Sequence, residues 1–285
     1  MITTATILSG VAQGLIWAIL TLGVYLTFRI LDIADLTVEG TFPLGAAVTV
    51  VLINTGMSPA MAMLCALLAG AAAGFITGFL HTIFQIPAIL SGILTMIALY
   101  SVNIRIMSDK ATVALEQPSL KTWMLSLLPE GTVSNTVSII LGTVFCLLIV
   151  ALLYYFFGTE IGCAVRATGS NQNMARSLGV KTDRVIILGL MISNALVALS
   201  GSLIAQLDYG SALVTMGQGT IVIGLASVII GEVILGHRLS NFAGKLASCI
   251  IGAILYYVVI QVVLRLGLNT NDLKLLTALI VALAR

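Results

Sequence analysis

Long apolar stretches, separated by short polar or charged clusters, recur along the whole chain. A helix needs about 20 apolar residues to cross the hydrocarbon core of a bilayer at 1.5 Å per residue. The second, seventh and ninth stretches are short for a complete crossing. The pattern therefore predicts an all-α, polytopic transmembrane helical bundle of about 8–10 spans, with broken or half-spanning helices. The nine stretches cover residues 5–28, 40–54, 59–80, 87–106, 134–157, 185–207, 219–236, 243–264 and 272–284.

Composition supports a membrane protein and argues against a soluble one. Of the 285 residues, 59% are hydrophobic and 8% are charged, whereas about 25% of the residues in a typical soluble domain are charged. A water-soluble fold of this length could not bury so much apolar surface, and lipid removes the need to do so. The net charge is only +2, and the Lys and Arg residues form no basic block. Nucleic acid is therefore not an expected partner.

The positive charges also predict an orientation, because cytoplasmic connections carry more Lys and Arg. If the first span enters from outside, eight of the 13 Lys and Arg residues fall on the cytoplasmic side, four of them in the connection 158–184. We therefore expect the amino end outside and the carboxyl end in the cytoplasm. The first apolar run continues to about residue 28, too long for a secretory signal, so it is expected to stay as a span. No repeat divides the chain, and residues 1–285 are expected to form a single transmembrane domain.

Two connections are long, and each has two interpretations. The external loop 107–133 contains the apolar sequence WMLSLL, which suits the membrane interface. This loop is either a docking surface or a passive linker. The cytoplasmic loop 158–184 is either an ordinary orienting loop or a contact surface for another protein.

A short helix outside the membrane is predicted within the cytoplasmic loop. Ser170 or Asn171 can cap its amino end, and Gly179 stands where a helix needs a left-handed terminating residue. Met174 and Leu178 are four residues apart and therefore share a face. A short capped helix with an apolar face is suited to a groove of another protein.

The cytoplasmic loop resembles one known family closely. Its sequence combines Gly162, Ala164, Arg166, Ala167, Gly169, Asn171, Gly179 and Val180. This combination is similar to the cytoplasmic loop of bacterial ABC importer permeases of the branched-chain amino acid and ribose type, although the family commonly has two small residues where this chain has Met174 and Ala175. In that family the loop carries the helix that docks on the ATP-binding subunit. The resemblance implies that the contact with an ATPase is formed or shaped by Arg166, Gly169, Asn171, Ala175 and Gly179.

Two further segments share the resemblance, which extends from near residue 10 to about 284. Residues 29–47, RILDIADLTVEGTFPLGAA, resemble the segment after the first helix in a subgroup that works with a binding lipoprotein. Residues 224–236, GLASVIIGEVILG, resemble the Gly-rich late helices. The resemblance implies a homodimeric permease in a bacterial cell membrane, with an ABC ATPase on the cytoplasmic face and a substrate-binding lipoprotein on the outer face. Amino acids, particularly aromatic ones, are the expected solutes, although relatives carry nucleosides and sugars.

The sequence contains no motif of an enzyme or a metal site. It has no G-x-x-x-x-G-K-[ST] loop, no H-E-x-x-H or G-x-S-x-G site, and no CxxC pair among its 4 cysteines. We therefore expect no catalytic activity, no cofactor and no metal in this chain. If ATP drives transport, a partner subunit must bind it.

Acidic residues at membrane depth need a reason, because an ionised side chain in hydrocarbon costs roughly 3 kcal/mol or more. Asp35 and Glu39 lie at the start of the short second segment, near the positive end of its expected helix. They either cap that helix and make structural hydrogen bonds or line an inner vestibule. Phe42 follows on the same segment and is included among the cap or pathway candidates.

Glu232 is the acidic residue on which an alternative function rests. It lies inside an apolar run, and we expect it either to pair with His237 or Arg238 or to contact the solute. A stand-alone secondary transporter or channel for a small solute needs an ionisable group in the membrane as a coupling site. Glu232 is the candidate for that role.

Glycine recurs at every fourth position in the third segment, at Gly70, Gly74 and Gly78. Small residues at this spacing let two helices approach closely in lipid. The row predicts helix packing and carries no information on the solute.

Overall fold

The computed structural model describes residues 4–127, 134–235 and 241–265. Within these residues, seven helices are long and apolar enough to cross a membrane, and an eighth, α2 (Val38–Asn54), is apolar but shorter. The predicted all-α membrane bundle is confirmed, and the ninth apolar stretch, 272–284, lies outside the described residues. Six of the seven are α1 (Thr4–Tyr25), α3 (Pro59–Thr82), α4 (Ala88–Ile106), α6 (Ser134–Phe157), α9 (Thr182–Ile204) and α11 (Phe242–Arg265). The seventh, α10 (Thr220–Leu235), reaches spanning length only together with the turn before it, as Val214–Leu235.

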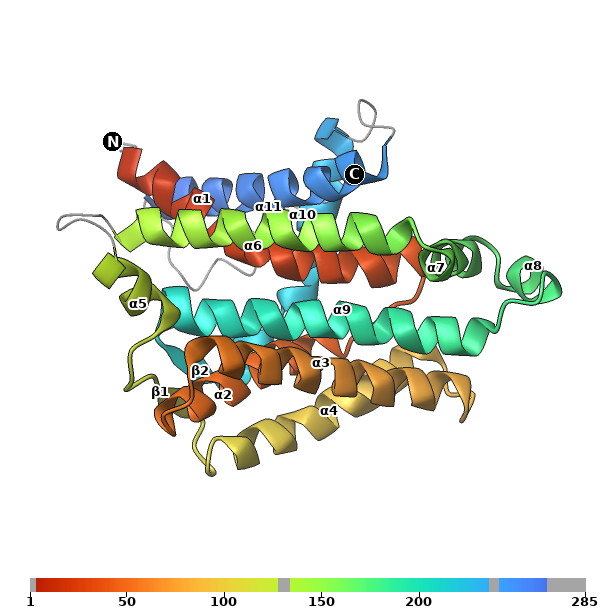
Figure 1. Ribbon diagram of the computed structural model, residues 1–285, viewed down its shortest axis with the longest axis horizontal. Helices are drawn as coiled ribbons and strands as arrows, with labels where there is room; N and C mark the ends of the chain where they lie inside the picture. The colour runs from red at the N-terminus through yellow and green to blue at the C-terminus, as the bar shows by residue number, and fades with distance from the viewer. Residues whose placement is uncertain (1–3, 128–133, 236–240, 266–285) are drawn as a thin grey trace.

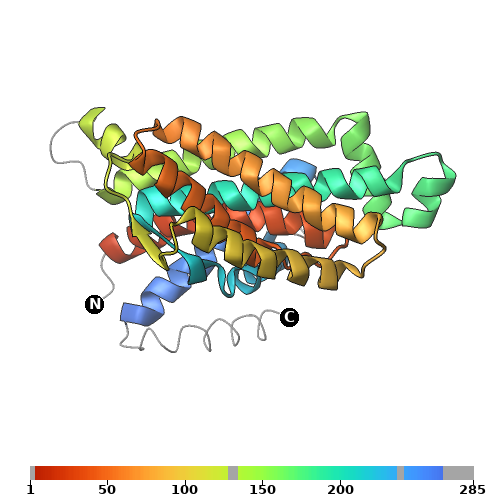
Figure 2. The ribbon, with the colours of Figure 1, turned by 90° about the horizontal axis from the view of Figure 1, so that it is seen from below.

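Most of the helices lie side by side along the long axis of the molecule (Figure 1). One end carries the short helices α7 (Glu160–Ser170) and α8 (Gln172–Ser177), and we call it the α8 end. The opposite end carries helix α5 (Leu120–Leu127), and we call it the α5 end. Seen from below, α3 and α4 lie next to each other along one face of the bundle (Figure 2).

Helix α9 lies at the centre of the bundle and packs closely on α3. All three members of the glycine row on α3 contact it. A Cβ added at Gly70 would lie 2.5 Å from the Asn194 carbonyl oxygen, and one at Gly74 would lie 2.3 Å from the Leu190 carbonyl oxygen. The absence of side chains at these positions lets the two backbones approach, which confirms the packing role predicted for the row.

The chain re-enters the bundle after α1. A π-helical turn, Leu26–Ile30, extends α1 to the α8 end, and residues 31–37 then return as irregular backbone to the start of α2. The α2 helix is about 25 Å long at 1.5 Å per residue and runs from inside the bundle to the α5 end. Irregular backbone at membrane depth is tolerated only where protein surrounds it or where it lines a water-filled cavity.

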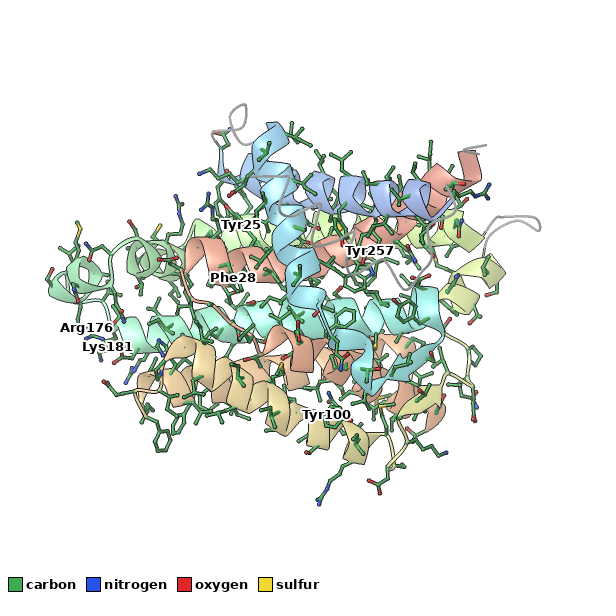
Figure 3. The ribbon with its side chains drawn as sticks, turned by 180° about the vertical axis from the view of Figure 1, so that it is seen from behind. Tyr25, Phe28, Tyr100, Arg176, Lys181 and Tyr257 are labelled. Carbon is green, nitrogen blue, oxygen red and sulfur yellow. The ribbon has the colours of Figure 1, made fainter. Side chains whose placement is uncertain are left out.

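A second interruption precedes α10. After the π-helical turn Ala205–Tyr209, strand β2 (Ser211–Leu213) pairs antiparallel with strand β1 (Thr112–Ala114), with Thr112 opposite Leu213. A 3-10 turn, Val214–Gly217, leads to α10, which crosses α1 and α11 at a steep angle (Figure 3). The sequence pattern singled out two short stretches that fall on described residues, and they correspond to α2 and α10. Both helices are preceded by irregular backbone.

The described part of the external loop 107–133 is bonded to the bundle. The Lys121 ammonium donates to the Leu207 carbonyl oxygen over 2.7 Å, and the Leu120 backbone N–H donates to the Gln206 side-chain oxygen. Trp123, in the WMLSLL sequence on α5, is exposed. The loop is therefore tied to the segment after α9, and its role in docking remains a prediction.

Candidate functional site

A short capped helix projects from the α8 end. The Asn171 side chain accepts a hydrogen bond from the Met174 backbone N–H over 3.0 Å, and Gly179, after the helix, has φ +86°. Asn171 is thus the cap, and Gly179 takes the left-handed conformation that a residue with a Cβ adopts only with strain. The sequence prediction of a short helix with these two boundaries is confirmed.

Two apolar side chains, one on α8 and one directly after it, are exposed among polar ones. Met174 and Leu178 are 61% and 72% exposed, whereas Ala175 is 2% exposed and faces inward. Arg176 donates to the Thr182 hydroxyl over 3.1 Å and to the Asp183 carboxylate over 2.9 Å, which ties α8 to the first turn of α9. The arrangement holds two apolar side chains outward at the tip of the molecule.

Two other residues of the predicted ATPase contact pack against neighbouring helices. The Arg166 guanidinium carbon lies 5.4 Å from the centre of the Phe242 ring, a cation–π contact between α7 and α11. A Cβ added at Gly169 would lie 1.8 Å from the Ile30 carbonyl oxygen. Gly169 therefore lets α7 lie directly against the end of the extended α1, and both residues position the loop relative to the bundle.

A buried polar network holds the re-entrant segment. Asp35 is fully buried, and its carboxylate accepts hydrogen bonds from the Thr37 backbone N–H over 2.9 Å and from the Asn194 amide over 2.7 Å. The Thr41 hydroxyl donates to the Asn194 side-chain oxygen over 2.8 Å, and the Thr37 and Thr77 hydroxyls are 2.7 Å apart. These bonds join the start of α2 to α9 and α3, so the contacts of Asp35 are structural.

Phe42 lies in the core and lines none of the described pockets. It is fully buried and stacks on Trp17 with ring centres 5.1 Å apart. The Phe42 side chain points from α2 towards α1, where Trp17 lies, whereas Gly40 and Pro43 of α2 line a pocket. In this structure Phe42 therefore packs in the core and does not line the pocket.

Glu232 has a partner that the sequence did not suggest. Its carboxylate accepts a hydrogen bond from the Arg29 Nε over 2.7 Å, which joins α10 to the end of the extended α1. The suggested partners His237 and Arg238 lie outside the described residues. The sequence alone does not predict this pair, because 203 residues separate the two side chains and only the fold brings them together.

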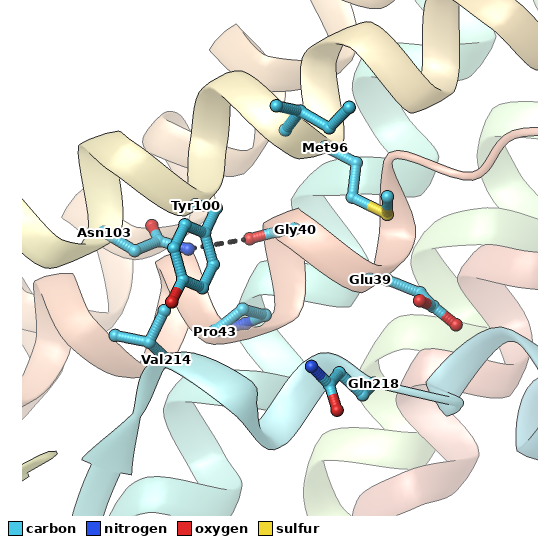
Figure 4. Close-up of a pocket in the computed structure, with 9 residues that line it drawn as sticks. Glu39, Gly40, Pro43, Met96, Tyr100, Asn103, Val214 and Gln218 are labelled. Atoms are coloured by element: carbon cyan, nitrogen blue, oxygen red, sulfur yellow. Dashed lines mark hydrogen bonds between the residues drawn. The ribbon is translucent and has the colours of Figure 1, made fainter. Parts of the chain in front are cut away.

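A pocket of about 500 Å³ lies where the two interrupted helices begin (Figure 4). Glu39, in the first turn of α2, lies on its wall and accepts a hydrogen bond from the Gly219 backbone N–H over 3.0 Å. Gly219 directly precedes α10, so this bond joins the starts of the two helices. Helix α4 forms the opposite wall. The pocket is lined by Glu39, Gly40, Pro43, Met96, Ile97, Tyr100, Asn103, Val214 and Gln218.

Sequence reasoning missed three polar members of this pocket, which are Tyr100, Asn103 and Gln218. Asn103 is fully buried; its amide donates to the Gly40 carbonyl oxygen over 3.1 Å, and its side-chain oxygen has no hydrogen-bond partner. A buried Asn in an apolar run was a usable signal, because such residues need partners. Gln218 gave no such signal, since it lies in a polar connection.

Comparison with known proteins identifies a family. The family model described as the permease component of branched-chain amino acid transport systems matches residues 6–284. The chain is 40% identical to a tyrosine transport system permease protein of Clostridioides difficile, over 96% of this chain and 88% of that protein. It is 35% identical to an uncharacterised protein of Rickettsia prowazekii, over 96% of this chain and 94% of that one.

A less similar relative is named for a different solute. The autoinducer 2 import system permease protein of Photorhabdus laumondii is 29% identical to this chain, over 88% of this chain and 70% of that protein. The similarity therefore extends along nearly the whole chain, through both the α8 end and the pocket.

Proposed function

Because the chain belongs to the family of permease components of branched-chain amino acid transport systems, we propose that it forms the solute path of an ATP-driven importer. It is a multi-pass membrane protein and a transport subunit of ABC transport systems. The proposal adds that a separate ATPase drives it from the α8 end, in the cytoplasm. A second copy of the chain completes the path, and a binding lipoprotein delivers solute at the α5 end.

The observation that carries the proposal is the apolar tip of α8. Met174 on α8 and Leu178 directly after it are exposed, whereas Ala175 faces inward and is buried, and Asn171 caps the amino end of the helix. Two apolar side chains held outward beyond the bundle suit a groove of a partner protein. When ATP closes the partner, movement of this helix passes to α1 through Gly169 and to α9 through Arg176, and shifts the population of outward-facing and inward-facing states.

We propose an amino acid as the solute, with an aromatic one favoured. The support is the 40% identity with a protein named as a tyrosine transport permease, over most of both chains. The relative named for autoinducer 2 import is less similar, and its name shows that solutes differ within the wider group. Radiolabelled L-tyrosine is therefore the first solute to test.

The test changes the apolar tip and measures both association and transport. Met174→Asp combined with Leu178→Asp is expected to reduce the amount of cognate ATPase that co-purifies and to abolish ATP-dependent uptake of L-tyrosine into vesicles. Gln172→Asp is the matched control, because it adds an acid to the same helix in the first turn, where negative charge is favourable. Undiminished ATPase retention by the double variant, at normal membrane insertion, would contradict the proposal.

The same vesicles test the alternative of a stand-alone transporter. That alternative relied on Glu232 as a coupling acid, and Glu232 pairs with Arg29 at one end of the bundle. Uptake driven by a proton or sodium gradient, without an ATPase, would support the alternative. Uptake only with ATPase and ATP supports the importer.

A further inference from the structure

The pocket at the start of α2 and α10 lies midway along the length of the bundle and opens at its side, where Ile97 and Tyr100 are exposed. Asp35, one turn before Glu39, bonds to Asn194, which is about 18 Å from the first residue of α9 at 1.5 Å per residue. Many secondary transporters place solute sites near the middle of the bilayer, where interrupted helices begin. The pocket of this chain has a comparable position.

The pocket carries one formal negative charge, which is balanced only by the amino ends of α2 and α10. Glu39 is the only acidic residue among those that line it, and no Lys, Arg or His is among them. Within the described residues, the Glu39 carboxylate has no ion-pair partner and accepts one backbone hydrogen bond, from Gly219. A carboxylate at this depth is costly without a positive partner. The site therefore favours a cation and disfavours an anion.

A second acceptor lies in the same wall. The Asn103 side-chain oxygen is buried without a hydrogen-bond partner, and the amide of the same side chain is held by the Gly40 carbonyl oxygen. Because that bond fixes the amide, the oxygen remains the unmatched group. Because Asn103 is fully buried, a donor from a ligand reaches this oxygen only when the side chains around it move, and the bond then recovers the free energy that an unmatched buried acceptor costs.

The rest of the pocket is apolar and of suitable size. Pro43, Met96, Ile97 and Val214 line it, and Tyr100 adds its ring (Figure 4). A volume of about 500 Å³ falls within the usual range for small-molecule sites, which combine apolar walls with a few polar groups. Such walls suit the side chain of an apolar or aromatic amino acid.

We propose that this pocket is a subsite for the solute and binds the ammonium group of an amino acid. Glu39 supplies the negative charge, Asn103 supplies a second acceptor, and the walls from α2 and α4 contact the solute's side chain. The choice of an amino acid rests on the proposed function. Binding in the pocket itself requires neither the ATPase nor ATP, so it is measurable on the purified permease alone.

The test measures protection of a cysteine placed in the pocket. Met96→Cys is introduced with Cys65→Ser and Cys163→Ser, which remove the two native cysteines that are not buried. The rate of modification by N-ethylmaleimide, a neutral reagent, is measured on the purified permease. L-tyrosine and tyramine, which both carry the ammonium group, are expected to slow labelling severalfold. The analogue 3-(4-hydroxyphenyl)propanoate, which lacks it, is expected to have no effect.

Variants of the two acceptors complete the test. Glu39→Gln and Asn103→Leu are each expected to abolish protection by tyramine, whereas Glu116→Gln, which removes a carboxylate outside the pocket, is expected to keep it. Glu39→Asp, which retains the charge, is expected to keep partial protection by tyramine. That result would show that the loss of protection in Glu39→Gln does not arise from misfolding. Equal protection by the propanoate, or full protection of Glu39→Gln, would overturn the proposal.

The outcomes separate this inference from the proposed function. Protection by L-tyrosine without any ATP-dependent uptake by the assembled transporter would leave the subsite in place and overturn the importer proposal. Normal ATP-dependent uptake by Glu39→Gln, without any protection in the parent, would overturn the subsite and leave the importer.

Discussion

Asp35 and its partners show how single polar residues set the path of the chain inside the membrane. The Asp35 carboxylate accepts one bond from its own segment, through Thr37, and one from α9, through Asn194. Both donors are buried. Without this acceptor the Thr37 N–H would be left unmatched, and the Asn194 amide would keep only its bond to the Leu190 carbonyl oxygen. The point at which the chain turns back into the bundle is therefore determined by hydrogen bonding rather than by apolar burial.

Replacing Asp35 by Asn is expected to destabilise the protein. The Asn amide can still accept from the Thr37 N–H, but it then presents a second donor to the Asn194 amide, and the charge-assisted bond is lost. We expect a loss of about 1–3 kcal/mol in the free energy of unfolding, seen as a lower melting temperature in detergent. Asp32→Asn is the matched control, because Asp32 is exposed and Asn tolerates its φ of +55°. Equal melting temperatures for the two variants would refute the role given to Asp35.

At the scale of elements, close contact between helix backbones organises the bundle. In the α3 and α9 pair, Gly74 brings the α3 backbone against the Leu190 carbonyl oxygen, and Gly70 does the same at Asn194. Helix association in lipid gains little from water expulsion, so such contacts supply packing that apolar side chains alone do not. The same principle places α7 against the end of the extended α1 at Gly169.

Gly74→Val is expected to separate α3 from α9. The added side chain would meet the Leu190 backbone, which cannot move without displacing α9, so a smaller yield of monodisperse protein and a lower melting temperature are expected. Ala72→Val adds two carbons at an exposed position two residues away on the same helix and is expected to be neutral. Size-exclusion chromatography and thermal unfolding of both variants check this. A Gly74→Val protein as stable as Ala72→Val would show that the close approach is dispensable.

At the scale of the whole molecule, the two ends of the bundle differ in a way that matches the proposed division of partners. The α8 end combines exposed apolar residues with Arg29 and Arg166 and with Arg176 and Lys181 (Figure 3). The α5 end combines a short strand pair with α5. A cytoplasmic location of the α8 end agrees with the excess of positive charge there.

The orientation can be tested with a cysteine that the chain already has. Cys163 on α7 is exposed, whereas Cys146 and Cys249 are buried. In a Cys65→Ser protein in intact cells, a membrane-impermeant maleimide is expected to leave Cys163 unlabelled and to label it after the cells are opened. Lys110→Cys, at the α5 end, is the matched control and is expected to be labelled in intact cells. Labelling of Cys163 from outside would reverse the proposed orientation.

The apolar pattern was sufficient to predict the membrane bundle. It located the eight predicted segments that fall on described residues, and it singled out two of them, which correspond to α2 and α10, as short. It was sufficient because lipid requires long apolar helices, a property of consecutive residues. Local capping rules likewise located the helix between Asn171 and Gly179. Only the tertiary structure determined that Glu232 pairs with Arg29, that Phe42 is buried against Trp17, and that Asn103 shares a pocket with Glu39. Those contacts join residues far apart in the chain, and their geometry depends on how the helices pack.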